Sequence, residues 1–124
     1  MNDSKTTLAE LRQVVKQFVD DREWQPFHNP KNLSMALAIE AAELMEHFQW
    51  LTLDESRQLD SNRLNQVAEE MADVLCYCLA LANSLDLDLS NTLERKMVKN
   101  RQKYPADEYR GRFGDSAPHS PTKP

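Results

Sequence analysis

Apolar residues recur at steps of three and four along most of the chain, and this spacing predicts four helices. We expect them at about residues 7–23, 33–51, 62–85 and 89–103. The third helix has the clearest pattern, with Leu64, Val67, Met71, Val74, Cys78, Leu81 and Leu85 at alternating steps. The chain has only two glycines and no long β-branched run, which favours helices over sheet. We therefore predict an all-α fold.

The segments outside these helices are rich in residues that disfavour helix. Residues 24–32 contain two prolines and two asparagines and are expected to form a loop, while residues 52–60 form a polar connection with a short helical turn. Residues 1–6 are predicted to be flexible, and residues 105–124, with four prolines and two glycines, to be mostly disordered. One domain over residues 7–104 follows from this pattern.

Length and charge narrow the function classes. A chain of 124 residues fits a single core, and its net charge of -5 disfavours binding to nucleic acid polymers or anionic membranes, which attract basic surfaces. No apolar run approaches the roughly 20 residues that span a bilayer, and the polar start of the chain does not resemble a signal peptide. We expect a cytoplasmic protein.

Two pairs of acidic residues lie beside the apolar faces of the second and third helices. Glu40 and Glu43 are three residues apart, as are Glu70 and Asp73. If the two faces pack together, the four carboxylates meet in one groove, where a divalent cation would relieve their repulsion. Oxygen ligands of this kind suit Mg²⁺ or Mn²⁺. The alternative is that all four are solvated acids on amphipathic helices, and their spacing alone fits both interpretations.

The wider sequence around these acids resembles a known family. The two pairs, separated by 26 residues, match the E-x-x-E…E-x-x-D signature of the all-α nucleotide pyrophosphohydrolases, the MazG-like group. The surrounding segments also look like those of the family, in order and in register, at residues 27–33, 46–50, 69–75 and 96–105. The resemblance covers about residues 7–110 and implies a four-helix MazG-like bundle that assembles into a dimer or a dimer of dimers.

The resemblance also implies an activity. Members of this group hydrolyse a nucleoside triphosphate between its α- and β-phosphates, and the four acids would be both catalytic residues and ligands of Mg²⁺, with Mn²⁺ as an alternative. The segments are most similar to those of members that act on dCTP, so we expect dCTP or a modified dCTP as substrate. Either Glu40 or Glu43 is expected to orient the attacking water, and the sequence does not choose between them.

Cationic and polar residues of the fourth helix are candidates for binding the triphosphate. Lys96, Asn100 and Lys103 lie at i, i+4 and i+7 and therefore share one face, and Tyr104 follows them. Resemblance to the family favours Lys96 and Asn100 most. The alternative for Lys103 is a solvated residue that complements the helix dipole.

Aromatic residues are candidates for stacking on the base. Trp24, His28, Trp50 and Tyr77 are predicted to lie around one end of the acidic groove. Trp24 has an alternative role in closing the first helix, and Trp50 in the core or an interface. His47 is predicted to form a structural hydrogen bond and not to bind metal.

Association with further copies is expected on two grounds. A four-helix unit of this size is marginally stable alone, and members of the family share sites between neighbouring chains. We therefore predict a homotetramer in which Trp24, His28 or Trp50 contributes to a neighbour's site. The rival hypothesis is a non-catalytic helical homo-oligomer that binds a nucleotide or metal. A di-iron carboxylate bundle is disfavoured, because its paired Glu-x-x-His motifs are absent.

Overall fold

The computed structural model describes residues 1–112, and all regular elements among them are helices. The longer helices are α1 (Leu8–Asp21), α2 (Pro30–Glu46), α4 (Ser61–Leu85) and α5 (Leu89–Lys103). The shorter ones are η1 (Gln25–Phe27), α3 (Leu53–Arg57) and α6 (Ala106–Tyr109). The all-α prediction is therefore confirmed. Residues 113–124, which carry most of the predicted tail, lie outside the described residues. None of the described helices is both long and apolar enough to cross a membrane.

Local capping sets where the first two long helices begin. Thr7 caps α1 in a reciprocal arrangement, since its hydroxyl accepts from the Glu10 N–H and its own N–H donates to the Glu10 carboxylate. Asn29 caps α2, and Pro30 occupies its first position, where a missing N–H costs no helical hydrogen bond. This arrangement explains why α2 begins before the predicted residue 33. The helix also ends earlier than predicted, at Glu46.

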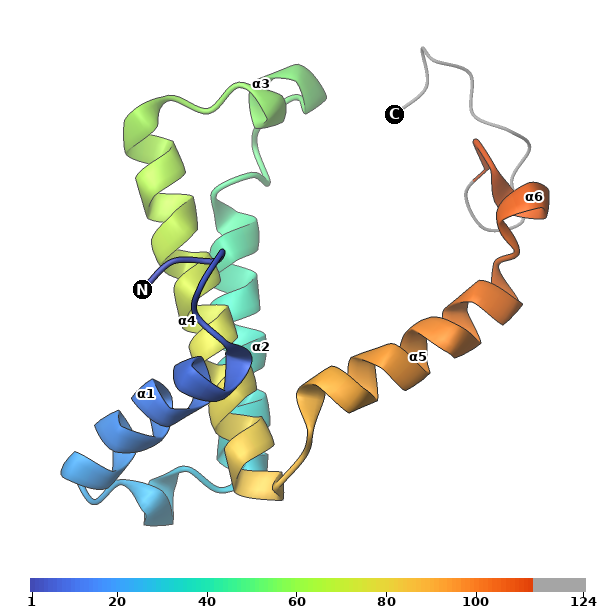
Figure 1. The fold of residues 1–124 in the computed structure, drawn as a ribbon. Coiled ribbons are helices and arrows are strands. Elements are labelled where there is room, and N and C mark those ends of the chain that lie inside the picture. Colours follow the sequence, from blue (N-terminus) through green and yellow to red (C-terminus); the bar gives the residue numbers. More distant parts are fainter. Residues whose placement is uncertain (113–124) are drawn as a thin grey trace. The chain divides into compact units, whose positions relative to one another are not determined.

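The chain divides into two compact units. The first runs from Met1 to Leu87 and the second begins at Asp88 and contains α5 and α6. In the first unit α2 and α4 run antiparallel along each other, and α1 packs across α4 (Figure 1). The predicted packing of the fourth helix into the same bundle stays a prediction, because α5 belongs to the second unit.

The apolar faces of the first unit are only partly buried. Its core consists of small and medium side chains: Val19, Leu33, Val67, Leu79, Ala80 and Ala82. Of the apolar series predicted along α4, Val67 is buried, whereas Leu64 and Met71 are more than half exposed. The apolar spacing along α4 therefore marks more positions than the single chain buries. On α2, Met35, Ile39 and Met45 are also more than half exposed.

Candidate functional site

Three of the four predicted acidic residues converge where α2 lies along α4. One carboxylate oxygen from each of Glu40, Glu43 and Glu70 lies within 4.8 Å of the other two. The spacing of three residues puts Glu40 and Glu43 on the same side of α2, and the packing of α4 against α2 brings Glu70 close to them. The Oε2 atoms of Glu40 and Glu70 are buried and have no hydrogen-bond partner among the described residues. Buried carboxylate oxygens without a partner are costly.

The electrostatics of this cluster show a deficit of positive charge. The pKa of Glu40 is raised to about 7, first by loss of hydration and then by a hydrogen bond with Glu43 and by the negative charges of Glu43, Asp73 and Glu70. A divalent cation would compensate this repulsion, and it would give the two unpartnered oxygens a ligand. An all-oxygen donor set suits a hard cation such as Mg²⁺ or Mn²⁺. The residues present therefore fit a divalent metal ion.

Asp73 lies at the edge of this cluster. It is exposed and does not belong to the set whose oxygens lie within 4.8 Å of one another. It is nevertheless close enough for its charge to raise the pKa of Glu40. The pKa of Tyr77, one helical turn further along α4, is raised by burial first and then by the charges of neighbours that include Glu40 and Asp73. Tyr77 thus lies beside the acidic cluster.

A row of aromatic rings extends from the acidic cluster towards the end of α1. The rings of Tyr77 and His28 have centroids 6.4 Å apart, and those of His28 and Trp24 are stacked at 6.1 Å. Trp24 in turn meets the edge of Phe18 at 5.7 Å. The structure thus brings together three of the four aromatic residues singled out in the sequence. It adds Phe18 of α1 to the row.

Trp50 is not part of this row. It follows the carboxyl end of α2, whereas His28 precedes the amino end, and a helix of 17 residues separates the two ends by about 25 Å. Its side chain is 87% exposed. Within one chain, Trp50 therefore has no contact with the other three aromatic residues.

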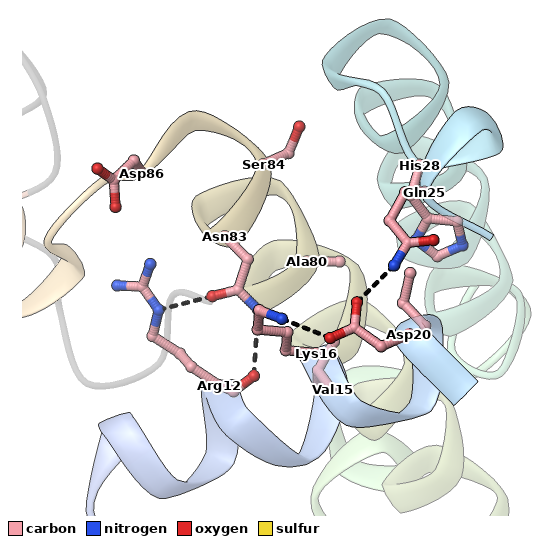
Figure 2. A pocket seen from close by; sticks show the side chains of 11 residues that line it. Arg12, Val15, Lys16, Asp20, Gln25, His28, Ala80, Asn83, Ser84 and Asp86 are labelled. Carbon is pink, nitrogen blue, oxygen red and sulfur yellow. Dashed lines mark hydrogen bonds and ion pairs between the residues drawn. The ribbon is translucent and has the colours of Figure 1, made fainter. Parts of the chain in front are cut away.

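A pocket of about 380 Å³ opens beside the aromatic row, between α1, η1 and α4, with His28 in its wall (Figure 2). Arg12 and Asn83 are joined there by two hydrogen bonds: Arg12 Nε donates to Asn83 Oδ1 at 2.9 Å and Asn83 Nδ2 donates to the Arg12 carbonyl at 3.1 Å. Asp20 accepts from Lys16 and from Gln25. The pocket combines apolar walls with fixed polar groups, which is typical of a small-molecule site. Sequence reasoning missed it, because its walls and the Arg12–Asn83 pair bring together elements that are distant in the sequence.

The candidate phosphate-binding residues lie in the second unit. Lys96, Asn100 and Lys103 are on α5, and the Asn100 side chain donates to the Met97 sulfur at 3.7 Å. The Lys103 ammonium lies 5.3 Å from the Tyr104 ring, whose edge contacts Tyr109. These residues therefore share one helix and its end, and their role towards phosphate stays a prediction.

Comparison with known proteins decides the family. The MazG-like family matches residues 35–113, which is more than half of the chain. The chain belongs to the MazG-like family. This confirms the resemblance found in the sequence, and the helical architecture agrees with it.

Individual relatives of this MazG-like chain include two curated proteins. It is 38% identical over 107 residues to dCTP pyrophosphatase 1 of Rattus norvegicus and 40% identical over 102 residues to dCTP pyrophosphatase 1 of Homo sapiens. The alignments cover 85% and 81% of this chain but 63% and 60% of the relatives. The chain thus spans about three fifths of their length.

This chain covers a larger share of one solved structure than of the two curated relatives. A crystal structure of a pyrophosphatase from Archaeoglobus fulgidus superposes with a TM-score of 0.76 at 39% identity. The superposition covers 85% of this chain and 98% of that chain. Nearly the whole of that protein is therefore represented here.

Proposed function

We propose that this chain is a divalent-metal-dependent nucleoside triphosphate pyrophosphohydrolase. It cleaves the α–β phosphoanhydride bond, with dCTP or a modified dCTP as substrate, and so removes selected nucleotides from the pool. The observation that carries this proposal is the convergence of Glu40, Glu43 and Glu70, with two buried oxygens that lack a partner. Solvated acids on a helix face would keep these oxygens in water. The relatives named dCTP pyrophosphatase 1 support the choice of substrate.

The acidic residues perform the central steps of the proposed mechanism. Glu40, Glu43, Glu70 and Asp73 would hold the metal, with Mg²⁺ as the proposed ion. Bound there, it would supply Lewis-acid polarisation of the phosphoryl oxygens and positive charge for the leaving pyrophosphate. Glu40 or Glu43 accepts a hydrogen bond from the attacking water and aligns it with the α-phosphorus. Phosphoryl transfer depends on positioning and charge stabilisation, so no covalent nucleophile from the protein is required.

The aromatic row and the adjoining pocket are proposed to receive the nucleoside. Tyr77 lies beside the acidic cluster and His28 lines the pocket, so a base placed there leaves its phosphates near the carboxylates. Trp24, which is 41% exposed, offers a stacking surface. Lys96, Asn100, Lys103 and Tyr104 are proposed to contact the triphosphate.

A second copy of the chain is proposed to complete the assembly as a dimer or a tetramer. Met35, Ile39 and Met45 of α2 and Leu64 and Met71 of α4 are each more than half exposed, and burying them would remove apolar surface from water. Trp50, exposed and remote from the aromatic row of its own chain, is proposed to serve the site of a neighbour.

The decisive experiment measures pyrophosphate release with Mg²⁺ from each of the eight common nucleoside triphosphates and from 5-methyl-dCTP. We expect the highest turnover with dCTP or its methylated form. Glu70→Gln and Asp73→Asn should each lower activity by roughly a hundredfold or more, because they remove charge from the metal site. Glu46→Gln is the matched control, since Glu46 is an exposed acid of the same helix as Glu43 and should leave turnover unchanged.

Circular dichroism should show that all variants remain helical. If folded wild-type protein cleaves none of the triphosphates, the enzymatic proposal is wrong. Binding of a nucleotide or Mg²⁺ without cleavage would instead support the rival hypothesis of a non-catalytic helical protein.

A further inference from the structure

The two carboxylate oxygens of Glu70 have different surroundings. Oε2 is buried and has no hydrogen-bond partner among the described residues. Oε1 faces the imidazole of His47, whose Nε2 lies 3.7 Å away. Both side chains are largely shielded from water, with 22% of His47 and 23% of Glu70 exposed. One oxygen thus faces a nitrogen of the protein, and the other is left for a ligand.

His47 is held in place by its backbone. It is the cap at the carboxyl end of α2, and its N–H donates to the carbonyls of Leu44 and Met45. Its own carbonyl accepts a hydrogen bond of 2.7 Å from Nη1 of Arg63, on the first turn of α4. This bond joins the end of α2 to the start of α4. Backbone hydrogen bonds therefore fix the position from which the His47 side chain extends.

The position of His47 also places it beside the other acids. It lies four residues after Glu43 and seven after Glu40, which puts all three on one side of α2 and its terminal turn. Its contact in the structure is nevertheless with the acid of the opposite helix, Glu70. Nε2 of His47 thus lies next to Glu70, at the end of the acidic cluster opposite Tyr77.

We propose that His47 is a positioning residue, which attracts Oε1 of Glu70 and thereby keeps Oε2 turned towards the metal. The proposal rests on the proposed metal-dependent function. A carboxylate can rotate about its terminal torsion, so a partner on one oxygen determines where the other points. Outer partners of this kind orient metal ligands, and their loss typically weakens metal binding by about 10–100-fold. The separation of 3.7 Å is longer than an ordinary hydrogen bond and leaves Nε2 of His47 as a neighbour of Oε1.

The test compares His47→Leu with His47→Gln in the full chain. Leucine retains an apolar side chain and removes the N–H donor, whereas the glutamine amide restores a donor at a similar reach. Mn²⁺ affinity is measured by electron paramagnetic resonance titration without nucleotide, and pyrophosphate release is measured as a function of Mg²⁺ concentration.

We expect His47→Leu to bind Mn²⁺ about tenfold or more weakly. Its turnover at saturating Mg²⁺ should stay close to the wild-type value, and His47→Gln should recover most of the lost affinity. Glu46→Gln, next to it in the chain, is the control for a change of residue at the end of α2 and should bind Mn²⁺ as the wild type does. Circular dichroism checks that each variant is folded.

Three results would overturn the role of His47. The first is that His47→Leu binds Mn²⁺ as tightly as the wild type. The second is that His47→Gln binds Mn²⁺ as weakly as His47→Leu. The third is a histidine nitrogen coupling to bound Mn²⁺ that disappears in His47→Leu, because His47 would then be a ligand itself. Failure of the proposed function looks different, since wild-type protein would then bind no Mn²⁺ or cleave no triphosphate.

Discussion

The carboxyl group of Glu40 retains its proton up to a higher pH than an ordinary glutamate. Its pKa is about 7 instead of 4.5, chiefly because of its loss of hydration and then because of Glu43. A carboxylate whose pKa is higher in the folded protein than in the unfolded chain stabilises the fold at low pH. That contribution is complete below the unfolded value of 4.5 and is lost as the pH rises through 7.

We therefore expect the metal-free protein to lose thermal stability between pH 5 and pH 8, and Glu40→Gln to lose less over the same range. Scanning calorimetry in the presence of a chelator measures both profiles. Saturating Mg²⁺ should reduce the loss in the wild type, because the metal ion competes with the proton for Glu40. Parallel profiles for the wild type and the variant would contradict this explanation.

Among the helices, α1 ends in a way that positions the aromatic row. The Glu23 N–H donates to the Asp20 carbonyl at 3.0 Å and the Trp24 N–H donates to the Val19 carbonyl at 3.1 Å. These are the two bonds of a Schellman motif, and the contact between Trp24 and Phe18 is the apolar contact that accompanies it. Trp24 thus closes the first helix and also stacks on His28, and its role towards a base stays a prediction.

The Schellman motif requires a residue with left-handed backbone conformation, and here that residue is Glu23 and not a glycine. Glu23 has a φ of 50°, where a Cβ atom costs about 1–2 kcal/mol. Glu23→Gly relieves this strain, but glycine also gives the unfolded chain more conformational freedom. That freedom lowers the free energy of unfolding by about 0.5–1 kcal/mol. We expect a net gain of up to about 1 kcal/mol in the free energy of unfolding, measured by urea titration. Glu23→Ala keeps the Cβ atom and is the control, and an equal gain from alanine would rule out backbone strain as the cause.

For the molecule as a whole, the exposed apolar side chains of α2 and α4 predict assembly. Light scattering should give the mass of a dimer or a tetramer, and an active monomer would exclude the shared site.

If Trp50 acts in a neighbour's site, Trp50→Ala and Glu70→Gln should each be inactive alone. Mixing equal amounts after dissociation should restore about a quarter of the wild-type sites in a dimer, because only mixed dimers have one site with both residues intact. No recovery on mixing would place Trp50 outside the shared site.

The sequence by itself determined the features that depend on near neighbours in the chain. Helix formation and the Thr7 cap follow from contacts over three or four residues, and the same spacing pairs Glu40 with Glu43. The family was also readable from the sequence, because its motif is a pattern of residue types in order. These interactions require no knowledge of how the helices pack.

Only the tertiary structure decided which distant residues meet. The Arg12–Asn83 pair joins residues 71 positions apart, and the contact between His47 and Glu70 crosses from one helix to another. The structure also left Met71 exposed although its spacing marks it as core, because the helical pattern identifies an apolar face but not what covers it. Periodicity constrains a single helix, whereas the distance and rotation between two helices depend on all the side chains packed between them. For that reason the acids could be found from the sequence, and the pocket and the partner of Glu70 could not.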